Sequence, residues 1–351
     1  MSHFDRPTTA FQEFIGSMRQ QWANQLYPAL HDEYQTAAQG QDIHTPEEAG
    51  AQVSELPLYH WFCFIERHYQ RMKYSDPRWG LASALAQRPE AVQAQLHPPT
   101  DSAGLKLHPD MPVPDYYSAV DIHQHPGNLV GADFDGLMYR ASATSIHPNT
   151  RRFEAHERFA AWLKNHGDFH HVLNMGCGFG KCGFPIARTF AQAQVIGIDV
   201  SAPCLRLAAH TAQEEGLNNI RFEQADAAHT PYADAAFDLV TSTQLLHELP
   251  VGEIQQVLNE SFRLLKPGGL VVHLDFRTHA PWLRFLLEGH SVRNNEGFLP
   301  AFNRMDMAAA LTQAGFEGGT IEPFAETEGS TGPNWPYWRF PWTLFWARKP
   351  G

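Results

Sequence analysis

The chain has 351 residues, of which 43% are hydrophobic and 18% charged, and this composition excludes a mainly disordered protein and a disulfide-stapled miniprotein. At roughly 150 residues per domain, the length predicts about two domains. Lys and Arg number 26 against 38 Asp and Glu, and the net charge of −12 disfavours nucleic acid and anionic membrane surfaces as partners.

The cysteines point to a reducing compartment. Cys63, Cys177, Cys182 and Cys204 are too few and too irregularly spaced for a disulfide framework, so we expect a cytoplasmic protein. No signal-peptide core is evident at the N-terminus, and the longest apolar stretch, residues 56–65, has about half the length of a membrane-spanning helix. We therefore expect no membrane partner, and the sequence leaves open whether the chain forms a homodimer.

Residues 1–96 are predicted to form a helical N-terminal domain. Apolar side chains at helical spacing indicate an amphipathic helix from residue 11, after Thr9 and Gln12, which have the spacing of a capping box. A second start signal at Thr45-Pro46-Glu47-Glu48 combines an N-cap, a first-turn proline and first-turn acids. The helical stripes comprise Phe14, Ile15, Met18, Trp22, Leu26, Leu58, Phe62, Ile65, Tyr69 and Met72.

Residues 97–151 are interpreted as a proline-rich linker followed by a lid. Five prolines between residues 97 and 117 predict a stretch without regular structure. A helix around Tyr139 is expected to close over the site, so that His123, Tyr139 or Arg140 faces the substrate. Asp121, His123 and His125 have a spacing that can bind a divalent metal ion, but we predict no metal and leave this question open.

From residue 152 onward, short β-branched runs alternate with helical segments. This pattern predicts an α/β fold with a doubly wound, mostly parallel Rossmann-like sheet covered on both faces. The expected strands lie at residues 171–173, 195–198, 220–222, 237–240, 270–274, 320–324 and 342–347.

A glycine-rich turn follows the first of these strands. Gly176, Gly178 and Gly180 occupy alternate positions, so that the backbone can approach a ligand at the carboxyl edge of the sheet. The G-x-G-x-x-G pattern of dinucleotide sites would need a glycine where Lys181 stands, and no G-K-[ST] closes a P-loop. The second strand ends at Asp199, where a carboxylate can accept hydrogen bonds from both ribose hydroxyls.

The ends of the next two strands carry further polar positions. Asp226 and Ala227 follow the third strand and can accept from, and donate to, an adenine base. After the fourth strand the chain reads Thr241-Ser242-Thr243-Gln244-Leu245-Leu246-His247-Glu248.

With these motifs in this order, residues 152–351 resemble the class I S-adenosylmethionine-dependent methyltransferases, most closely between residues 172 and 274. The core is similar to that of the quinone-biosynthesis C-methyltransferases. The resemblance implies a methyltransferase that uses S-adenosyl-L-methionine to methylate a small-molecule acceptor. It also implies that the three glycines lie against the methionine part, Asp199 against the ribose, Asp226 and Ala227 against the adenine, and Gln244 near the sulfonium. Asn174 stands where the family usually has an acid, and its side chain can still accept a hydrogen bond.

The acceptor side is less defined by the sequence. If the acceptor is a hydroxyl or thiol, His247 is the candidate general base, although it could instead hydrogen-bond only within its loop. The aromatic segment at residues 334–342, with Trp282 and Phe285, could form an aromatic box in which Trp282 and Trp335 contact the acceptor. A binding protein that senses the cofactor without catalysis and a nicotinamide-dependent oxidoreductase remain alternatives, and the acceptor and its methylated atom stay open.

Overall fold

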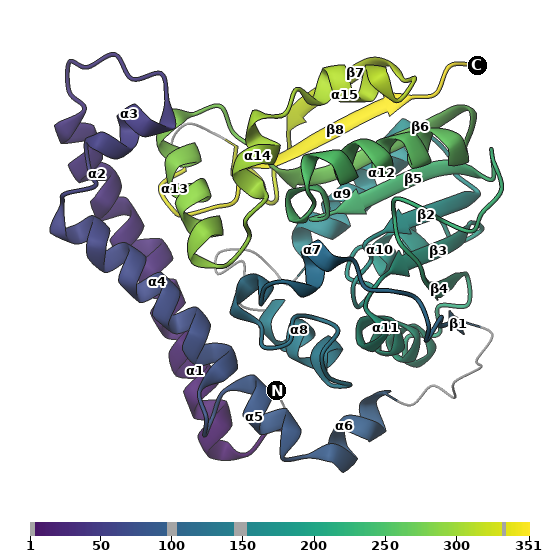
Figure 1. Ribbon diagram of the computed structural model, residues 1–351, viewed down its shortest axis with the longest axis horizontal. Coiled ribbons are helices and arrows are strands. Elements are labelled where there is room, and N and C mark those ends of the chain that lie inside the picture. The colour runs from purple at the N-terminus through teal and green to yellow at the C-terminus, as the bar shows by residue number, and fades with distance from the viewer. Residues whose placement is uncertain (1–3, 97–103, 144–152, 332–334) are drawn as a thin grey trace.

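The computed structural model describes residues 4–96, 104–143, 153–331 and 335–351 (Figure 1). The N-terminal part is helical, as predicted. Its elements are α1 (Arg6–Gln21), the π-helical turn η1 (Trp22–Leu26), α2 (Tyr27–Ala37), α3 (Pro46–Ala51), α4 (Pro57–Ser75), α5 (Leu81–Ala86) and α6 (Pro89–Leu96). None of the helices in the described ranges combines the length and the apolar character needed to cross a bilayer.

Two local predictions for the helix starts had different outcomes. Thr45 and Glu48 form the expected capping box at the start of α3. The predicted box at Thr9 and Gln12 is wrong, because α1 begins earlier: Asp5 is its N-cap, and the Asp5 carboxylate accepts a hydrogen bond from the Thr8 amide at 2.9 Å.

The proline-rich stretch contains more regular structure than we predicted. Strand β1 (Leu105–Lys106) pairs in parallel with β4 (Ile220–Gln224), at the two positions between prolines where the backbone can join a sheet edge. It is followed by α7 (Asp115–Ser118) and the 3₁₀ turn η2 (Ile122–Gln124). The helix predicted around Tyr139 is α8 (Asp135–Ala143). The expected domain boundaries at residues 96 and 151 adjoin or lie in segments outside the described residues and stay predictions.

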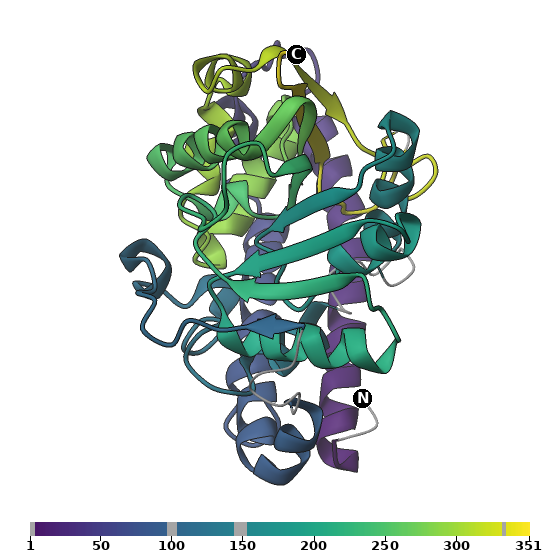
Figure 2. The ribbon, with the colours of Figure 1, turned by 90° about the vertical axis from the view of Figure 1, so that its right-hand side faces the viewer.

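The sheet has the predicted doubly wound architecture. Its eight strands lie in the order β1-β4-β3-β2-β5-β6-β8-β7, and only β8 pairs antiparallel with its neighbours. Figure 2 shows this twisted sheet. The remaining strands are β2 (His171–Met175), β3 (Gln194–Asp199), β5 (Phe237–Thr243), β6 (Leu265–Phe276), β7 (Glu317–Pro323) and β8 (Trp342–Arg348).

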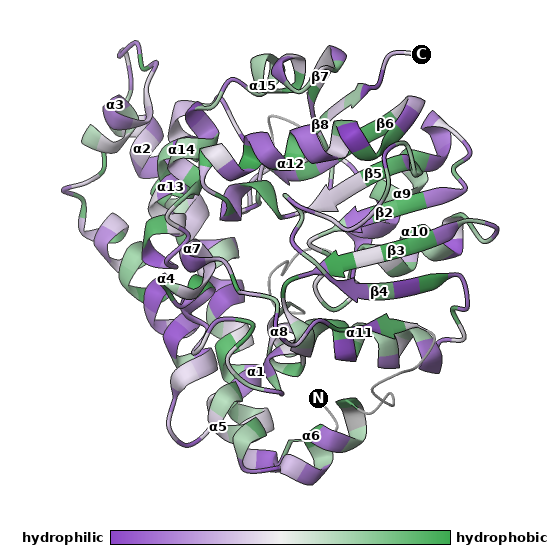
Figure 3. Cartoon of the chain, turned by 45° about the vertical axis from the view of Figure 1, so that its right-hand side comes forward, coloured by the Kyte–Doolittle hydropathy of each residue, from purple (hydrophilic) through white to green (hydrophobic). Residues whose placement is uncertain are grey.

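Helices cover both faces of the sheet, as its burial on both sides requires. The helices α9 (Glu154–His166), α10 (Gly183–Thr189) and α11 (Ala202–Glu214) contribute to one hydrophobic cluster, and α12 (Val251–Leu264) and α15 (Met307–Gln313) contribute to the other. Strand β3, in the middle of the sheet, is coloured largely as hydrophobic in Figure 3. The sequence analysis missed α13 (Pro281–Arg293) and α14 (Leu299–Arg304).

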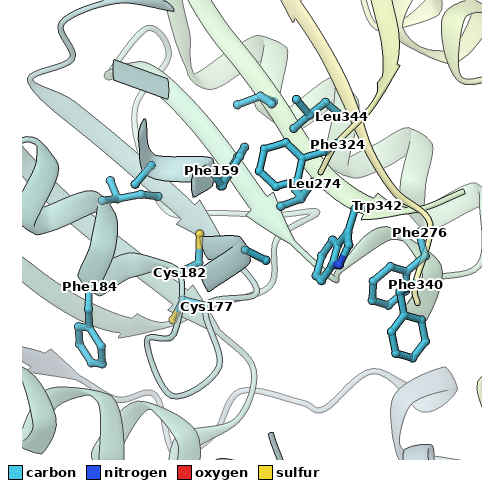
Figure 4. Packing of buried hydrophobic residues seen from close by; sticks show 14 of the residues in the cluster. Phe159, Cys177, Cys182, Phe184, Leu274, Phe276, Phe324, Phe340, Trp342 and Leu344 are labelled. Carbon is cyan, nitrogen blue, oxygen red and sulfur yellow. The ribbon is translucent and has the colours of Figure 1, made fainter. Parts of the chain in front are cut away.

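The N-terminal helices and the sheet share one core. The loop between β7 and β8 inserts Trp338 among these helices, with its ring 5.2 Å from the ring of Trp22 and its amide donating to the Ala23 carbonyl at 3.2 Å. Trp338 is 3% exposed. Two residues further on, Phe340 stacks on Phe276 at 4.5 Å, next to Trp342 (Figure 4). The aromatic segment is therefore partly core, and it connects the helical region to the sheet.

Candidate functional site

A cavity that is open in part to solvent lies where the carboxyl ends of the strands meet the N-terminal helices and the lid. The strand order reverses between β2 and β5, the position where doubly wound sheets bind ligands. Nine of the side chains and backbone positions predicted from the sequence line this cavity: His123, Tyr139, Gly176, Gly178, Asp199, Asp226, Ala227, Gln244 and His247.

The glycine turn needs glycine for conformational and steric reasons. Gly176 and Gly178 have φ angles of +60° and +53°, in the left-handed region that side chains rarely adopt. A Cβ atom on Gly178 would lie 3.2 Å from the Tyr139 ring, so the lid helix packs directly onto the backbone of the turn. Gly180, with φ +89°, lies outside the cavity lining and instead leads the turn into α10.

The carboxylate of Asp199 ties this turn to the end of β3. It accepts hydrogen bonds from the amides of Gly178 and Ser201, both at 2.8 Å. Burial nevertheless raises the pKa of Asp199 above its usual value. Each oxygen keeps a further lone pair, so the carboxylate can accept from a hydroxyl donor at the cavity wall.

Lys181 is a site residue that the sequence analysis missed. Its ammonium group donates to the Tyr139 hydroxyl at 2.9 Å and to Gln244 Oε1, and it forms no ion pair with a carboxylate of the described residues. Burial lowers the pKa of Lys181 to about 8. Its position directly after the glycine turn was the available signal, but we used it only as evidence against a dinucleotide site.

Several predicted residues lie outside the cavity lining: Asn174, Gly180, Arg140, Trp282 and Trp335. Asn174 is fully buried in β2, where its amide lies 3.5 Å from the Thr241 carbonyl and its Oδ1 has no hydrogen-bond partner among the described residues. Trp282 stacks on Tyr34 at 4.2 Å because α13 packs against the N-terminal helices. The aromatic box predicted around Trp282, Phe285 and Trp335 is therefore not part of this cavity, whose aromatic wall includes Phe276 and Phe340.

His247 lines the cavity but is not arranged as a general base. Its Nδ1 lies 2.5 Å from the buried carboxylate of Asp275, and its Nε2 lies 3.2 Å from Glu248 Oε1. Burial alone would lower the pKa of His247, but Asp275 and Glu248 outweigh it and raise the pKa well above the usual value. An imidazolium with both nitrogens hydrogen-bonded has no free lone pair, so the general-base prediction is unfavourable here.

The imidazole of His123 extends this network of acids and histidines. His123 Nε2 contacts the same Glu248 Oε1 at 3.0 Å, and His123 Nδ1 contacts Glu296 Oε1 at 2.8 Å. The two carboxylates outweigh burial and raise the pKa of His123 to about 10. Glu248 lines the cavity, and its buried Oε2 has no hydrogen-bond partner among the described residues.

The metal question left open by the sequence involves a different set of residues. His123, Glu248 and Glu296 approach one another within 4.8 Å and could hold an ion, but the two His123 nitrogens face different carboxylates, as in an ion-pair bridge. Asp121 instead accepts from the Gly127 amide. His125 is buried against Tyr74, and burial lowers its pKa to about 3. The Asp121, His123 and His125 group does not converge.

The network of ionisable side chains that begins at Asp275 and His247 ends at the junction of α4 and α13. His290 Nε2 lies 3.8 Å from Glu296, and its Nδ1 contacts the fully buried carboxylate of Glu66, which also contacts Arg293 Nε at 2.5 Å. Burial would raise the pKa of Glu66, but Arg293 and His290 outweigh it and lower the pKa to about 2. One continuous polar network therefore links the cavity to the N-terminal helices.

The cavity wall also contains strained backbone. His123, Asn128 and Gln244 have φ angles of 56°, 59° and 56°, which are uncommon for residues other than glycine. His123 is held by two carboxylates, Asn128 by the Tyr117 carbonyl and Gln244 by Lys181. Strain of this kind persists where surrounding contacts fix it, commonly at functional sites.

Fold and cavity together define a doubly wound domain with a ligand-sized cavity at the carboxyl edge of its sheet. Residues 172–269 match the family described as "Methyltransferase domain", in agreement with the resemblance that the motifs indicated. The chain is 37% identical over 162 residues to methyltransferase GfsG of Streptomyces halstedii, covering 44% of this chain and 56% of GfsG. It is 38% identical over 107 residues to demethylmenaquinone methyltransferase of Lactiplantibacillus plantarum, covering 30% of this chain and 44% of that protein.

The chain thus spans about half the length of the curated relatives that it matches. Among solved structures, a SAM-dependent methyltransferase of Methanosarcina mazei is 24% identical with a TM-score of 0.43, and the match covers 54% of this chain and 97% of that protein.

Proposed function

We propose that the protein is an S-adenosylmethionine-dependent methyltransferase that acts on a small-molecule acceptor. The observation that supports this most directly is the pairing of the glycine turn with Asp199 inside the cavity, within the part of the chain that matches the methyltransferase family. A carboxylate at the end of β3, hydrogen-bonded to the turn after β2, is suited to a nucleoside ligand.

The residues present fit this cofactor. Asp199 would hold the ribose, and Asp226 and Ala227 would contact the adenine. Lys181 supplies a buried cation without a carboxylate partner among the described residues, so it would bind the carboxylate of the methionine part. This assignment compensates for Asn174, which replaces the acid expected for the ammonium group and is buried behind the cavity wall.

When bound, the cofactor supplies a methyl group already activated by its sulfonium. The chain would then align the acceptor and exclude water, and orientation of this kind can contribute on the order of 7–11 kcal/mol. Tyr139 and the lid helix cover the turn, and Phe276 and Phe340 form an apolar wall. Glu248 Oε2 would accept a hydrogen bond from the acceptor, while His247 and His123 keep this carboxylate ionised and positioned.

The cavity bears on the two alternative functions. It continues beyond Gln244 and His247 to side chains of α1 and α4, so there is room for an acceptor that a cofactor-sensing protein would not need. Lys181, where a dinucleotide site would need glycine, disfavours the oxidoreductase. The acidic net charge supports a small-molecule acceptor over nucleic acid, and we propose a cytoplasmic location on the cysteine content.

Titration calorimetry with S-adenosylhomocysteine and with NADH tests the proposal. We expect S-adenosylhomocysteine to bind and NADH not to bind. Asp199→Asn should weaken S-adenosylhomocysteine about tenfold or more, because it removes charge-assisted hydrogen bonds. Asp133→Asn is a suitable control, since Asp133 is a surface acid paired with Arg206. Binding of NADH alone, or equal affinity in Asp199→Asn, would contradict the proposal.

A further inference from the structure

Helix α4 presents an unusual polar stripe to the interior. Glu66, Gln70 and Lys73 follow one another at spacings of four and three residues, on one face of the helix, and are 0%, 7% and 4% exposed. Arg293 and His290 neutralise Glu66. Gln70 and Lys73 face the cavity.

Lys73 has no carboxylate partner within ion-pair distance among the described residues. Its ammonium group lies over the Tyr74 ring, whose centroid is 4.6 Å away. Burying an ammonium ion without a counter-ion is costly, so such a lysine either loses its proton or is neutralised by a negatively charged group of a ligand. In a chain with 12 more acids than basic residues, this buried cation is a local exception.

The surroundings of Lys73 reinforce its positive charge. Arg19 on α1 lines the same cavity, is 4% exposed and donates to the Tyr69 hydroxyl at 2.6 Å. Burial and the charge of Arg19 lower the pKa of Lys73 well below its usual value. An anion bound beside Lys73 would reverse both effects, so its binding would be coupled to proton uptake by the lysine.

Elsewhere on its wall the same cavity offers a negative group. Glu248 lines the cavity, and its carboxylate contacts His247 and His123 at the carboxyl edge of the sheet. The cavity therefore has a cationic part at α1 and α4 and an acceptor of hydrogen bonds at the sheet edge. A ligand that satisfies both parts is dipolar.

We propose that the methyl acceptor carries an anionic group, a carboxylate or a phosphate, that binds Lys73 with Arg19 beside it, while an N–H or O–H group of the acceptor donates to Glu248. This inference rests on the proposed methyltransferase function and adds the chemical class of its acceptor.

Thermal unfolding of the full chain with sodium phosphate and sodium acetate tests this site, with sodium chloride at equal ionic strength as reference. We expect phosphate or acetate to raise the melting temperature of the wild type beyond the chloride reference, and more so at lower pH. The anion whose effect falls more on going from the wild type to Lys73→Met identifies the group, because phosphate also stabilises folded proteins without binding to a site. Lys73→Met should lower the anion affinity at least about tenfold, and Lys73→Arg should retain it.

The stability of the anion-free variants separates a binding role from a structural one. Lys73→Met should be as stable as the wild type or more stable, because it removes a buried amine whose charged form has no counter-ion among the described residues. Lys349→Met is the matched control: Lys349 donates to the carbonyls of Phe262 and Leu265, so this variant should lose stability but keep the anion response.

Two results would overturn the inference: no anion response in the wild type beyond the chloride reference, or an unchanged response in Lys73→Met. S-adenosylhomocysteine titrations on the same samples keep the two proposals apart. Lys73→Met should bind S-adenosylhomocysteine as the wild type does, and failure of the wild type to bind it would refute the methyltransferase proposal while the anion response stays readable.

Discussion

Glu66→Gln tests the polar junction between α4 and α13. The substitution keeps the shape of the side chain but removes the charge that Arg293 and His290 contact. The pKa of Glu66 is lowered from 4.5 to about 2, and at about 1.4 kcal/mol per pKa unit this corresponds to about 3 kcal/mol of stability at pH 7. The same magnitude is typical of breaking a buried ion pair by removing one partner.

The expected change in melting temperature follows from the chain length. With 351 residues and about 2.1 cal/mol/K of unfolding entropy per residue, a loss of about 3 kcal/mol lowers the melting temperature by about 4 °C. Because the folded pKa is depressed, this stability is present above pH 4.5 and is lost as the pH falls toward 2. The difference from wild type should therefore shrink to about 2 kcal/mol at pH 3.5.

Denaturant unfolding at pH 7 and pH 3.5 measures both quantities. Glu55→Gln, at an exposed position before α4, is the control and should change little. A double-mutant cycle with Arg293→Met should show strong coupling between the two sites. Equal stability of Glu66→Gln and wild type at pH 7, or a difference that does not decline with acid, would refute the account of this junction.

Three further predictions concern the cavity and the aromatic segment. Gly178→Ala should lower the affinity for S-adenosylhomocysteine and lower stability by about 1–2 kcal/mol. The control Gly216→Ala, at φ +67° with no neighbour within 4 Å, should lower stability without changing this affinity. Equal affinities of the two variants in calorimetry would contradict this prediction. Because the pKa of His123 is raised to about 10, its ion pairs should stabilise the folded wild type fully below pH 6.5, and this stability should be lost as the pH rises toward 10. In thermal scans, the melting temperature of His123→Gln should fall less over this pH range than that of the wild type. Trp338→Ala should lower the free energy of unfolding, measured with denaturant, by about 3–5 kcal/mol, and Trp335→Ala should lower it clearly less. Equal losses would show that Trp338 is not the residue that attaches this segment to the N-terminal helices.

The part of the cavity at the strand ends was largely predictable from the sequence. Gly176, Gly178 and Asp199 are defined by their positions at strand ends, and parallel strands bring such positions to one edge. Strands can be recognised from their apolar runs, and the carboxyl ends of parallel strands lie at one edge of the sheet, so the residues at these ends can be placed from the sequence. The same reasoning predicted all seven strands that follow residue 152.

The acceptor side could not be predicted in the same way, because it depends on how α1, α4 and α13 pack on the sheet. His247 was assigned as a base from its position, but its protonation depends on Asp275, a residue 28 positions away. Trp282 and Trp335 were selected as aromatic residues in loops, whereas helix packing buries Trp282 against Tyr34. The stripe of Glu66, Gln70 and Lys73 was visible at helical spacing, but the apolar residues beside it defined the predicted face.

Trp338 and Phe340 are only two residues apart on one segment, but their side chains lie in different environments. Trp338 is wedged among η1 and α4, and Phe340 forms part of the cavity wall against Phe276. A substitution that resizes the space around Trp22 would therefore be transmitted through this short segment to the wall that the acceptor meets. Variants selected for altered acceptor preference should accordingly include changes in η1, remote from any bound molecule.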